Sequence, residues 1–285
     1  METLYLIFID PFVQMVQAPD FLLQVLWEGF VSGVLYALIA LGFVLIFKAS
    51  GVLNFAQGIM VVFGALSLVG LTALGVPALL SLVICIGIMF VLAVGIERMV
   101  LRPLVNQPDI ILFMATIGLT YFLIGLGELI FGGEPKTMVT EQLMLPTGSS
   151  AFDILGGLLI LQHIDIAAAV IALVMVAALG FFFSKTRIGR ALVTGIMWGA
   201  RSDVSFALQI VAFKALPVII LGGLTSIPGA IVGGLVIGIG EKLGEIYWGP
   251  LVGGGIESWL AYIIALAFLL FRPQGLFGER IIERI

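Results

Sequence analysis

The sequence predicts an all-α polytopic integral membrane protein with about seven to eight transmembrane helices. Three observations support this fold class: the composition, the hydropathy and the spacing of the charges. Hydrophobic residues make up 61% of the 285 residues and charged residues only 11%, whereas ordinary soluble domains contain about 25% charged residues. Mean hydropathy is +1.26. A soluble domain of this composition would expose large apolar patches, which lipid solvates and water does not.

The charge-free runs give the expected spans in order, because a bilayer-spanning helix needs roughly 17–25 mostly apolar residues. The first span is expected at 29–47. The run 49–96 is long enough for two spans, with a turn where Gly75 and Pro77 interrupt it. The remaining spans are expected at 110–131, 166–184, 215–240 and 256–271. We therefore treat residues 1–285 as one transmembrane domain.

The stretch 132–164 is the longest polar excursion and is expected to be an outer, periplasmic loop. Its segment 146–150 reads Pro-Thr-Gly-Ser-Ser, which favours turns over a continuing helix. We expect the loop to carry a short surface helix. His163, beside Asp165, is expected to be a solvated interfacial residue, because metal sites need several convergent donors.

The basic residues predict the orientation of the chain through the positive-inside rule. Nine of the 13 Lys and Arg residues follow alternate spans. They are Lys48, Arg98, Arg102, Lys185, Arg187, Arg190, Arg272, Arg280 and Arg284. The first 28 residues contain acidic residues and no Lys or Arg. We therefore expect the N-terminus outside and the C-terminus in the cytoplasm.

Several functional classes find no support in the sequence. The net charge of −4 is too small to suggest nucleic-acid binding, and the single Cys85 excludes an intrachain disulfide. The chain contains no G-x-x-x-x-G-K-[ST] phosphate loop, no H-E-x-x-H and no G-x-S-x-G. We expect no catalytic residue, no metal site and no cofactor held by this chain.

Asn54, Gln57 and Gly58 form a polar island between apolar runs. Unpaired amides in hydrocarbon cost several kcal/mol. These side chains must therefore face other helices, a pore or the membrane interface. Structural contact between helices and a substrate pathway are both open interpretations.

A second island, Thr225, Ser226 and Pro228, lies in a glycine-rich stretch. The stretch contains two G-x-x-x-G pairs, Gly229 with Gly233 and Gly234 with Gly238. One interpretation is close helix packing, which small residues permit in lipid. The other is a broken or re-entrant helix near 222–230, which is tolerated at membrane depth where protein or a water-filled cavity surrounds it.

Seven short segments then occur in a fixed order along the chain: residues 33–42 (GVLYALIALG), 52–58 (VLNFAQG), 97–104 (ERMVLRPL), 186–192 (TRIGRAL), 213–215 (FKA), 221–230 (LGGLTSIPGA) and 272–278 (RPQGLFG). This ordered set resembles the branched-chain amino-acid class of bacterial ABC-transporter permeases, specifically the first of the two paired permease types. The resemblance covers nearly the whole chain.

The resemblance implies an assembly in the bacterial inner membrane. A second permease subunit would complete the translocation path, and two cytoplasmic ATPase subunits would bind ATP and Mg and drive alternating access. A periplasmic solute-binding protein would deliver branched-chain amino acids, or urea or short amides. The two polar islands would line the path. The surface facing the ATPases would include Thr186, Arg187, Gly189 and Arg190.

The chain departs from the family pattern after Leu192. The family has a coupling helix and a further transmembrane helix here, whereas residues 193–199 resemble the end of that second helix. On the order of 30 residues, the length of a short helix plus a span, are therefore missing. The loss removes most of the coupling surface and changes the number of later crossings. We expect the stretch up to Lys214 to lie along the inner face.

Two rival functions stay open. A stand-alone channel or secondary transporter would need Glu128 or Glu257 to supply ion coupling or selectivity. Both lie near expected outer ends of spans, where an interfacial carboxylate is the simpler explanation. A coupling-deficient remnant of a permease would follow from the missing segment. The expected spans contain no paired catalytic side chains, so the sequence does not support an intramembrane enzyme.

Overall fold

The computed structural model describes residues 2–50, 53–104, 107–134, 145–154, 157–183 and 213–277. The α-helices of this part are α1 (Glu2–Phe8), α2 (Asp10–Gln17), α3 (Pro19–Ser50), α4 (Gln57–Ala73), α5 (Ala78–Ile96), α6 (Asp109–Phe131), α7 (His163–Phe183), α10 (Ala215–Gly222), α11 (Ile227–Tyr247), α12 (Gly249–Val252) and α13 (Glu257–Phe271). A π-helical turn (Glu97–Leu101) and a 3₁₀ turn (Arg102–Leu104) extend α5. The strands are β1 (Ser149–Ile154) and β2 (Gly157–Gln162).

The predicted all-α membrane fold is confirmed in its main features. Four described helices are long and apolar enough to cross a membrane, by length and composition: Pro19–Lys48, Ala78–Leu104, Ile110–Phe131 and Ile227–Tyr247. Shorter apolar helices cover Gln57–Ala73, His163–Ala178 and Glu257–Phe271. The turn expected at Gly75 and Pro77 separates α4 from α5, and Gly75 there has a φ of 81°.

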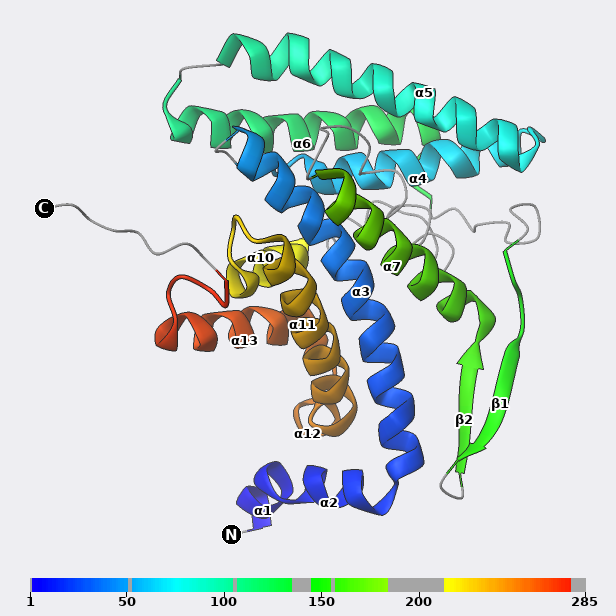
Figure 1. Ribbon diagram of the computed structural model, residues 1–285, viewed down its shortest axis with the longest axis vertical. Helices are drawn as coiled ribbons and strands as arrows, with labels where there is room; N and C mark the ends of the chain where they lie inside the picture. The colour runs from blue at the N-terminus through cyan, green and yellow to red at the C-terminus, as the bar shows by residue number, and fades with distance from the viewer. Residues whose placement is uncertain are drawn as a thin grey trace, which may run out of the picture.

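Helix α3 is the centre of the larger helical group. Figure 1 shows α7 and α11 running beside α3, with α10 and α13 next to α11, while α4, α5 and α6 form a separate layer at one end. Most of α3 between Val31 and Leu45 is buried, and it packs there against α7, α10 and α11. Because lipid is as apolar as these side chains, close packing rather than hydrophobicity holds such helices together.

The contact between α3 and α11 is a crossing of two small-residue faces. A Cβ on Gly33 would lie 2.8 Å from the carbonyl oxygen of Gly234, and a Cβ on Gly234 would lie 2.7 Å from the Cβ of Ala37. Gly238 meets the backbone of Gly29 and Gly33. The two helices therefore run antiparallel, and the packing interpretation of these glycines is confirmed.

The same glycine-rich stretch also breaks the helix, so both interpretations hold. Helix α10 ends at Gly222, α11 begins at Ile227, and Gly223 between them has a φ of 103°. The backbones of Gly222 and Gly229 come too close to admit a Cβ on either residue. The hydroxyl of Ser226 accepts a hydrogen bond from the N–H of Gly229 (3.1 Å) and caps α11.

The C-terminal segment binds the carbonyl groups left at the end of α10. The N–H of Leu276 donates to the carbonyl of Leu221 (2.8 Å), and that of Phe277 donates to the carbonyl of Gly222 (3.1 Å). An unsatisfied backbone group in an apolar environment costs several kcal/mol. These two bonds therefore make the helix break tolerable.

Helices α4, α5 and α6 form the second helical group. The Sγ of Cys85 on α5 donates to the carbonyl of Gly64 on α4 (3.2 Å). The rings of Phe63 on α4 and Phe131 on α6 meet edge to face, with centroids 5.3 Å apart. The outer faces of α5 and α6 expose large apolar side chains, as helices do when lipid or another apolar surface covers them.

The surface helix expected within 132–164 is wrong for the described part of that loop. Strands β1 and β2 pair there as an antiparallel hairpin, with Ser149 opposite Gln162. Exposure alternates along β2 with the two-residue period of a strand, and the run is too short for a buried helix. The ring of His163 closes the hairpin through the hydroxyl of Ser150 (2.7 Å). The Oε1 of Gln24 on α3 accepts a bond from the N–H of Ile160 (3.1 Å) and fixes the hairpin to α3.

Candidate functional site

The first polar island lies where α4 begins beside α3. The Oδ1 of Asn54 accepts a hydrogen bond from the N–H of Ala56 (3.1 Å), which turns the chain into α4. Gln57 is the first residue of α4, and its Nε2 donates to the carbonyl of Ile39 on α3 (3.3 Å). Asn54, Gln57 and Gly58 are all buried. The island is therefore a contact between two helices.

Gln57 nevertheless keeps one unsatisfied polar atom. Its Oε1 finds no hydrogen-bond partner in the described segments, although the residue is only 4% exposed. Gly42 makes room for the amide, because a Cβ at position 42 would collide with the Nε2 of Gln57. A buried acceptor without a partner costs about 1–3 kcal/mol. Helix packing alone therefore does not explain an amide at this position.

The second polar island lies at the break between α10 and α11. Thr225 and Ser226 are half-buried, and Pro228 is exposed. Ser226 caps α11, and Pro228 lies in its first turn, where a missing N–H breaks no helix bond. Two of the three candidates thus have a structural role in starting α11.

The structure does not bring the two islands together. Gly33 of α3 faces α11, whereas Gly42 of α3 faces Gln57. At 3.6 residues per turn, their nine-residue separation puts them about 180° apart around the helix. The helices that carry the two islands, α4 and α11, therefore meet α3 on opposite faces.

A third polar cluster, which the sequence did not reveal, joins α3 to α10 and α11. The hydroxyl of Tyr36 on α3 donates to the Oε2 of Glu241 on α11 (2.8 Å). The Nζ of Lys214, the N-cap residue of α10, lies 3.3 Å from the same oxygen and 3.4 Å from the Tyr36 hydroxyl. Glu241 is 2% exposed and Lys214 is 7% exposed. Within the part of the chain that the structure describes, the Oε1 of Glu241 has no hydrogen-bond partner.

The cluster continues toward the surface through Glu257 on α13. The Nζ of Lys214 lies 3.9 Å from the Oε1 of Glu257, and the Nζ of Lys242 lies 3.4 Å from its Oε2. The side chains of Glu257 and Lys242 are 38% and 29% exposed. Two ammonium groups and two carboxylates therefore alternate from the surface to the interior, and their formal charges cancel. We call Tyr36, Lys214, Glu241, Lys242 and Glu257 the ionic cluster.

The ionic cluster escaped the sequence reasoning because its members lie far apart in the chain. Hydropathy treats Lys214 and Glu241 only as the borders of one charge-free run. Helical spacing is the signal that could have found it. Tyr36 follows Gly33 by three residues, and Glu241 follows Gly238 by three. Each polar side chain therefore continues the small-residue face along which the two helices meet.

Other predicted residues are placed only in part. The four candidates for the ATPase-facing surface lie outside the described residues and stay predictions: Thr186, Arg187, Gly189 and Arg190. Most of the stretch up to Lys214 also lies outside them. Glu128 is exposed on α6. The described residues contain no group of three or more His, Cys, Asp or Glu side chains that could hold a metal ion.

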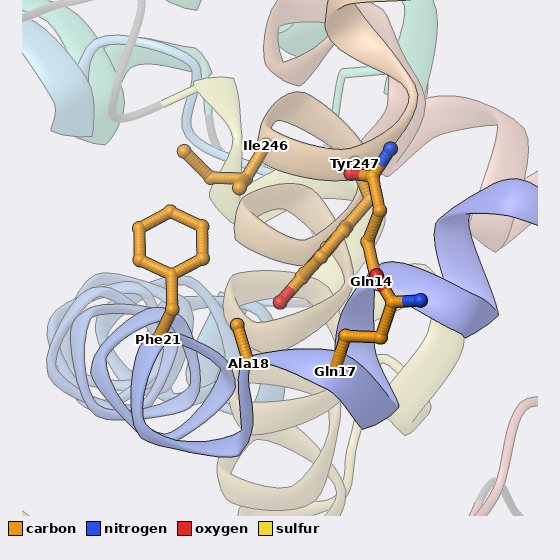
Figure 2. Close-up of a pocket in the computed structure, with 6 residues that line it drawn as sticks. All are labelled: Gln14, Gln17, Ala18, Phe21, Ile246 and Tyr247. Atoms are coloured by element: carbon orange, nitrogen blue, oxygen red, sulfur yellow. The ribbon is translucent and has the colours of Figure 1, made fainter. Parts of the chain in front are cut away.

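One pocket lies between the corner joining α2 to α3 and the end of α11 (Figure 2), and its volume is about 270 Å³. It is lined by Gln14, Gln17, Ala18, Phe21, Ile246 and Tyr247. The ring of Tyr247 points toward Ala18 and Phe21. None of the residues predicted from the sequence lines this pocket.

Comparison with known proteins gives a consistent result. A family model described as branched-chain amino acid transport system / permease component matches residues 25–195. The high-affinity branched-chain amino acid transport system permease protein BraD of Pseudomonas aeruginosa is 26% identical over 92% of this chain and 98% of its own length. The corresponding protein LivH of Escherichia coli K12 is 24% identical over 93% of this chain and 98% of its own length. No solved structure matches the chain.

The alignment with BraD runs over 309 positions, although it uses only 92% of the 285 residues here. The relative therefore carries residues inside the aligned region that this chain lacks. The family model covers more than half of the chain and ends at residue 195, and the apolar helices described above suit a multi-pass membrane protein. The chain belongs to the family of branched-chain amino acid transport system permease components.

Proposed function

We propose that this chain is the membrane-spanning permease subunit of an ABC importer. It would translocate branched-chain amino acids, or related small polar solutes such as urea or short amides, by alternating access. The observation that carries the proposal is the family match over residues 25–195. The names of the curated relatives, which are permease proteins of high-affinity branched-chain amino acid transport systems, support the substrate class.

The partners follow from what this chain lacks. Its sequence contains no phosphate-binding loop, so ATP and Mg would be bound by two cytoplasmic ATPase subunits. A second permease subunit would cover the apolar faces that this chain leaves exposed, and a periplasmic solute-binding protein would present the substrate. The chain itself would catalyse no reaction and hold no cofactor.

The path would use the polar groups that flank α3. Gln57 is the best supported, because its Oε1 is buried and unsatisfied. Asn54 and Gly58 position it at the start of α4. Thr225, Ser226 and Pro228, at the break between α10 and α11, would form the second group of path residues. Broken helices at membrane depth are a common way to expose backbone dipoles to a transported solute.

The helix directions support an N-terminus in the periplasm. Helix α11 runs antiparallel to α3 and to α13, since Gly240 and Gly244 of α11 meet Ile264 and Leu260 of α13 respectively. With the N-terminus outside, α3 runs inward, α11 outward and α13 inward. Arg272 at the end of α13 is then cytoplasmic, as the positive-inside rule requires.

This orientation changes the expectation for Lys214. Helix α10 runs antiparallel to α11, and Lys214 pairs with Glu241 in the second half of α11. That position lies about 21 Å along α11 from its inner end, at 1.5 Å per residue. With this proposed orientation Lys214 would lie away from the inner face, whereas the sequence analysis expects the stretch up to it to lie along that face.

A coupling-deficient permease is the second candidate function. The internal residues that BraD has and this chain lacks favour it, because the family pattern has a coupling helix after Leu192. The fold and the substrate path would then be present, but the contact that couples ATP hydrolysis in the ATPase subunits to movement of the permease would be missing.

Uptake into proteoliposomes distinguishes the two candidates. The chain is reconstituted with its genomic neighbours, beside a version in which the missing segment is restored from a relative, and ATP-dependent uptake of labelled leucine and urea is measured. Uptake by both versions supports the importer. Uptake only after restoration supports the coupling-deficient permease, and no uptake by either contradicts both.

A further inference from the structure

Lys214 lies between two carboxylates from different helices. Its Nζ is 3.3 Å from Glu241 on α11 and 3.9 Å from Glu257 on α13. Charge-assisted N–H···O bonds are about 2.7–2.9 Å long. A movement of roughly 1 Å toward Glu257 would therefore complete a bond there and release Glu241.

Stability alone does not explain this buried pair. Replacing a buried ion pair by apolar side chains of similar volume is often neutral or stabilising, because both charges lose their hydration. The pairing is also incomplete, since the Oε1 of Glu241 has no partner among the described residues and the residue is 2% exposed. An acceptor left open in the interior points to a donor that arrives from elsewhere.

Helix α10 can deliver such a movement. It is eight residues long, or about 12 Å, and it ends at the break around Gly223, whose φ is 103°. Lys214 lies at the opposite end of α10. A rotation of roughly 5° about the break would move Lys214 by about 1 Å, given that helix length. Hinges of this kind need only a few residues at the end of an element.

We propose that Glu241 binds the α-ammonium group of the transported amino acid and that Lys214 occupies this carboxylate when substrate is absent. Lys214 moves to Glu257 as the substrate ammonium takes its place. Tyr36 keeps its hydrogen bond to Glu241 throughout, and the substrate ammonium supplies the donor that the Oε1 lacks. Glu241 thus always has a cation beside it. This matters because a buried carboxylate without a counter-ion strongly destabilises the fold.

The inference rests on the proposed function and narrows its substrate class. A carboxylate at this depth favours solutes with a cationic group, such as zwitterionic amino acids. Urea and short amides carry no ammonium and could not replace Lys214 at low energetic cost. Transport of amino acids should therefore depend on the ionic cluster, and exposed carboxylates elsewhere should not matter.

The test uses the complete transporter in proteoliposomes, in whichever version of the chain transports leucine. The double variant Lys214→Met/Glu241→Met removes both charges and keeps the volume, so its melting temperature should stay near that of the wild type. Its leucine uptake should fall at least about tenfold, within the range of coupling between linked sites. Glu257→Gln removes the second carboxylate beside Lys214, together with the ion pair between Glu257 and Lys242, and its uptake should fall about fivefold. Glu128→Gln, an exposed carboxylate on α6, is the matched control and should transport normally.

Direct binding gives the second measurement. Leucine should raise the melting temperature of the wild-type complex lacking the solute-binding protein, and should not do so for the double variant. Normal uptake by a folded double variant, or an unchanged leucine-induced shift, overturns the inference while leaving the proposed function intact. Absence of leucine uptake by every version of the wild type overturns the proposed function and this inference with it.

Discussion

Replacing Gly234 by Ala should loosen the contact between α3 and α11. The added Cβ would lie 2.6 Å from the carbonyl oxygen of Gly33 and 2.7 Å from both the Cβ and the N of Ala37. Ordinary contacts begin at 3.4 Å, so the helices must separate by roughly 0.8 Å if their backbones stay intact. The carbonyl oxygen of Gly33 and the N of Ala37 belong to the backbone of α3, so they cannot rotate away as the end of a long side chain could.

Overpacking of this kind costs about 1–3 kcal/mol, and contact with two residues one turn apart on the same face of α3 favours the upper part of that range. Alanine recovers up to about 1 kcal/mol through its better helix propensity. We therefore expect a net loss of about 2 kcal/mol in the free energy of unfolding. The measurement is reversible unfolding in mixed micelles, followed by circular dichroism.

Gly87→Ala on α5 is the matched control. A Cβ there would meet none of the described residues within 4 Å, so only the propensity gain applies, and stability should stay equal or rise by up to about 1 kcal/mol. If both variants shift stability in the same direction and by the same amount, the close crossing of α3 and α11 is refuted.

The remaining predictions concern polar residues and use the same unfolding assay. Lys214→Met alone leaves Glu241 buried without a cation and should destabilise the protein by about 3–5 kcal/mol; adding Glu241→Met should restore most of that loss, and a double variant as unstable as the single one would contradict the pairing. Ser226→Ala removes the cap of α11 and should cost about 1 kcal/mol, whereas Ser226→Asn should cost little. Gln57→Leu removes the unsatisfied buried acceptor and should leave stability equal or higher; a large loss would mean that the bond to Ile39 dominates.

Sequence patterns predicted the order of the helices because apolar run length and turn residues are local properties. The interruption at Gly75 and Pro77 and the break after Gly222 both follow from the backbone preferences of Gly and Pro. The same reasoning failed for β1 and β2, because a segment of six residues is too short for its pattern to distinguish a strand from part of a helix.

The candidate site was only half visible in the sequence. Gln57 could be found because a lone amide among apolar residues is conspicuous in a chain that crosses lipid. The pairing of Lys214 with Glu241 could not be found in this way, since it depends on how α10 folds back on α11. Both residues also look ordinary at the ends of an apolar run, where charged side chains are expected.

The positions of the helices that carry the two polar islands could be learned only from the structure. In the sequence both islands look like interruptions of one permease path, whereas the helices that carry them, α4 and α11, meet opposite faces of α3. This arrangement identifies Gln57 as the more informative residue, because it combines burial with an unsatisfied acceptor and is not needed to cap a helix.

The most direct test of the transport role is ATP-dependent leucine uptake by the wild type and by Gln57→Leu. The two proteins are compared at equal reconstituted amounts, after unfolding measurements have shown that their stabilities are equal. We predict uptake by the wild-type assembly that requires ATP, and at least about a tenfold loss in Gln57→Leu despite its intact fold. Equal uptake by both proteins would contradict a path at the start of α4. Leucine uptake without ATP and without ATPase subunits would contradict the importer itself.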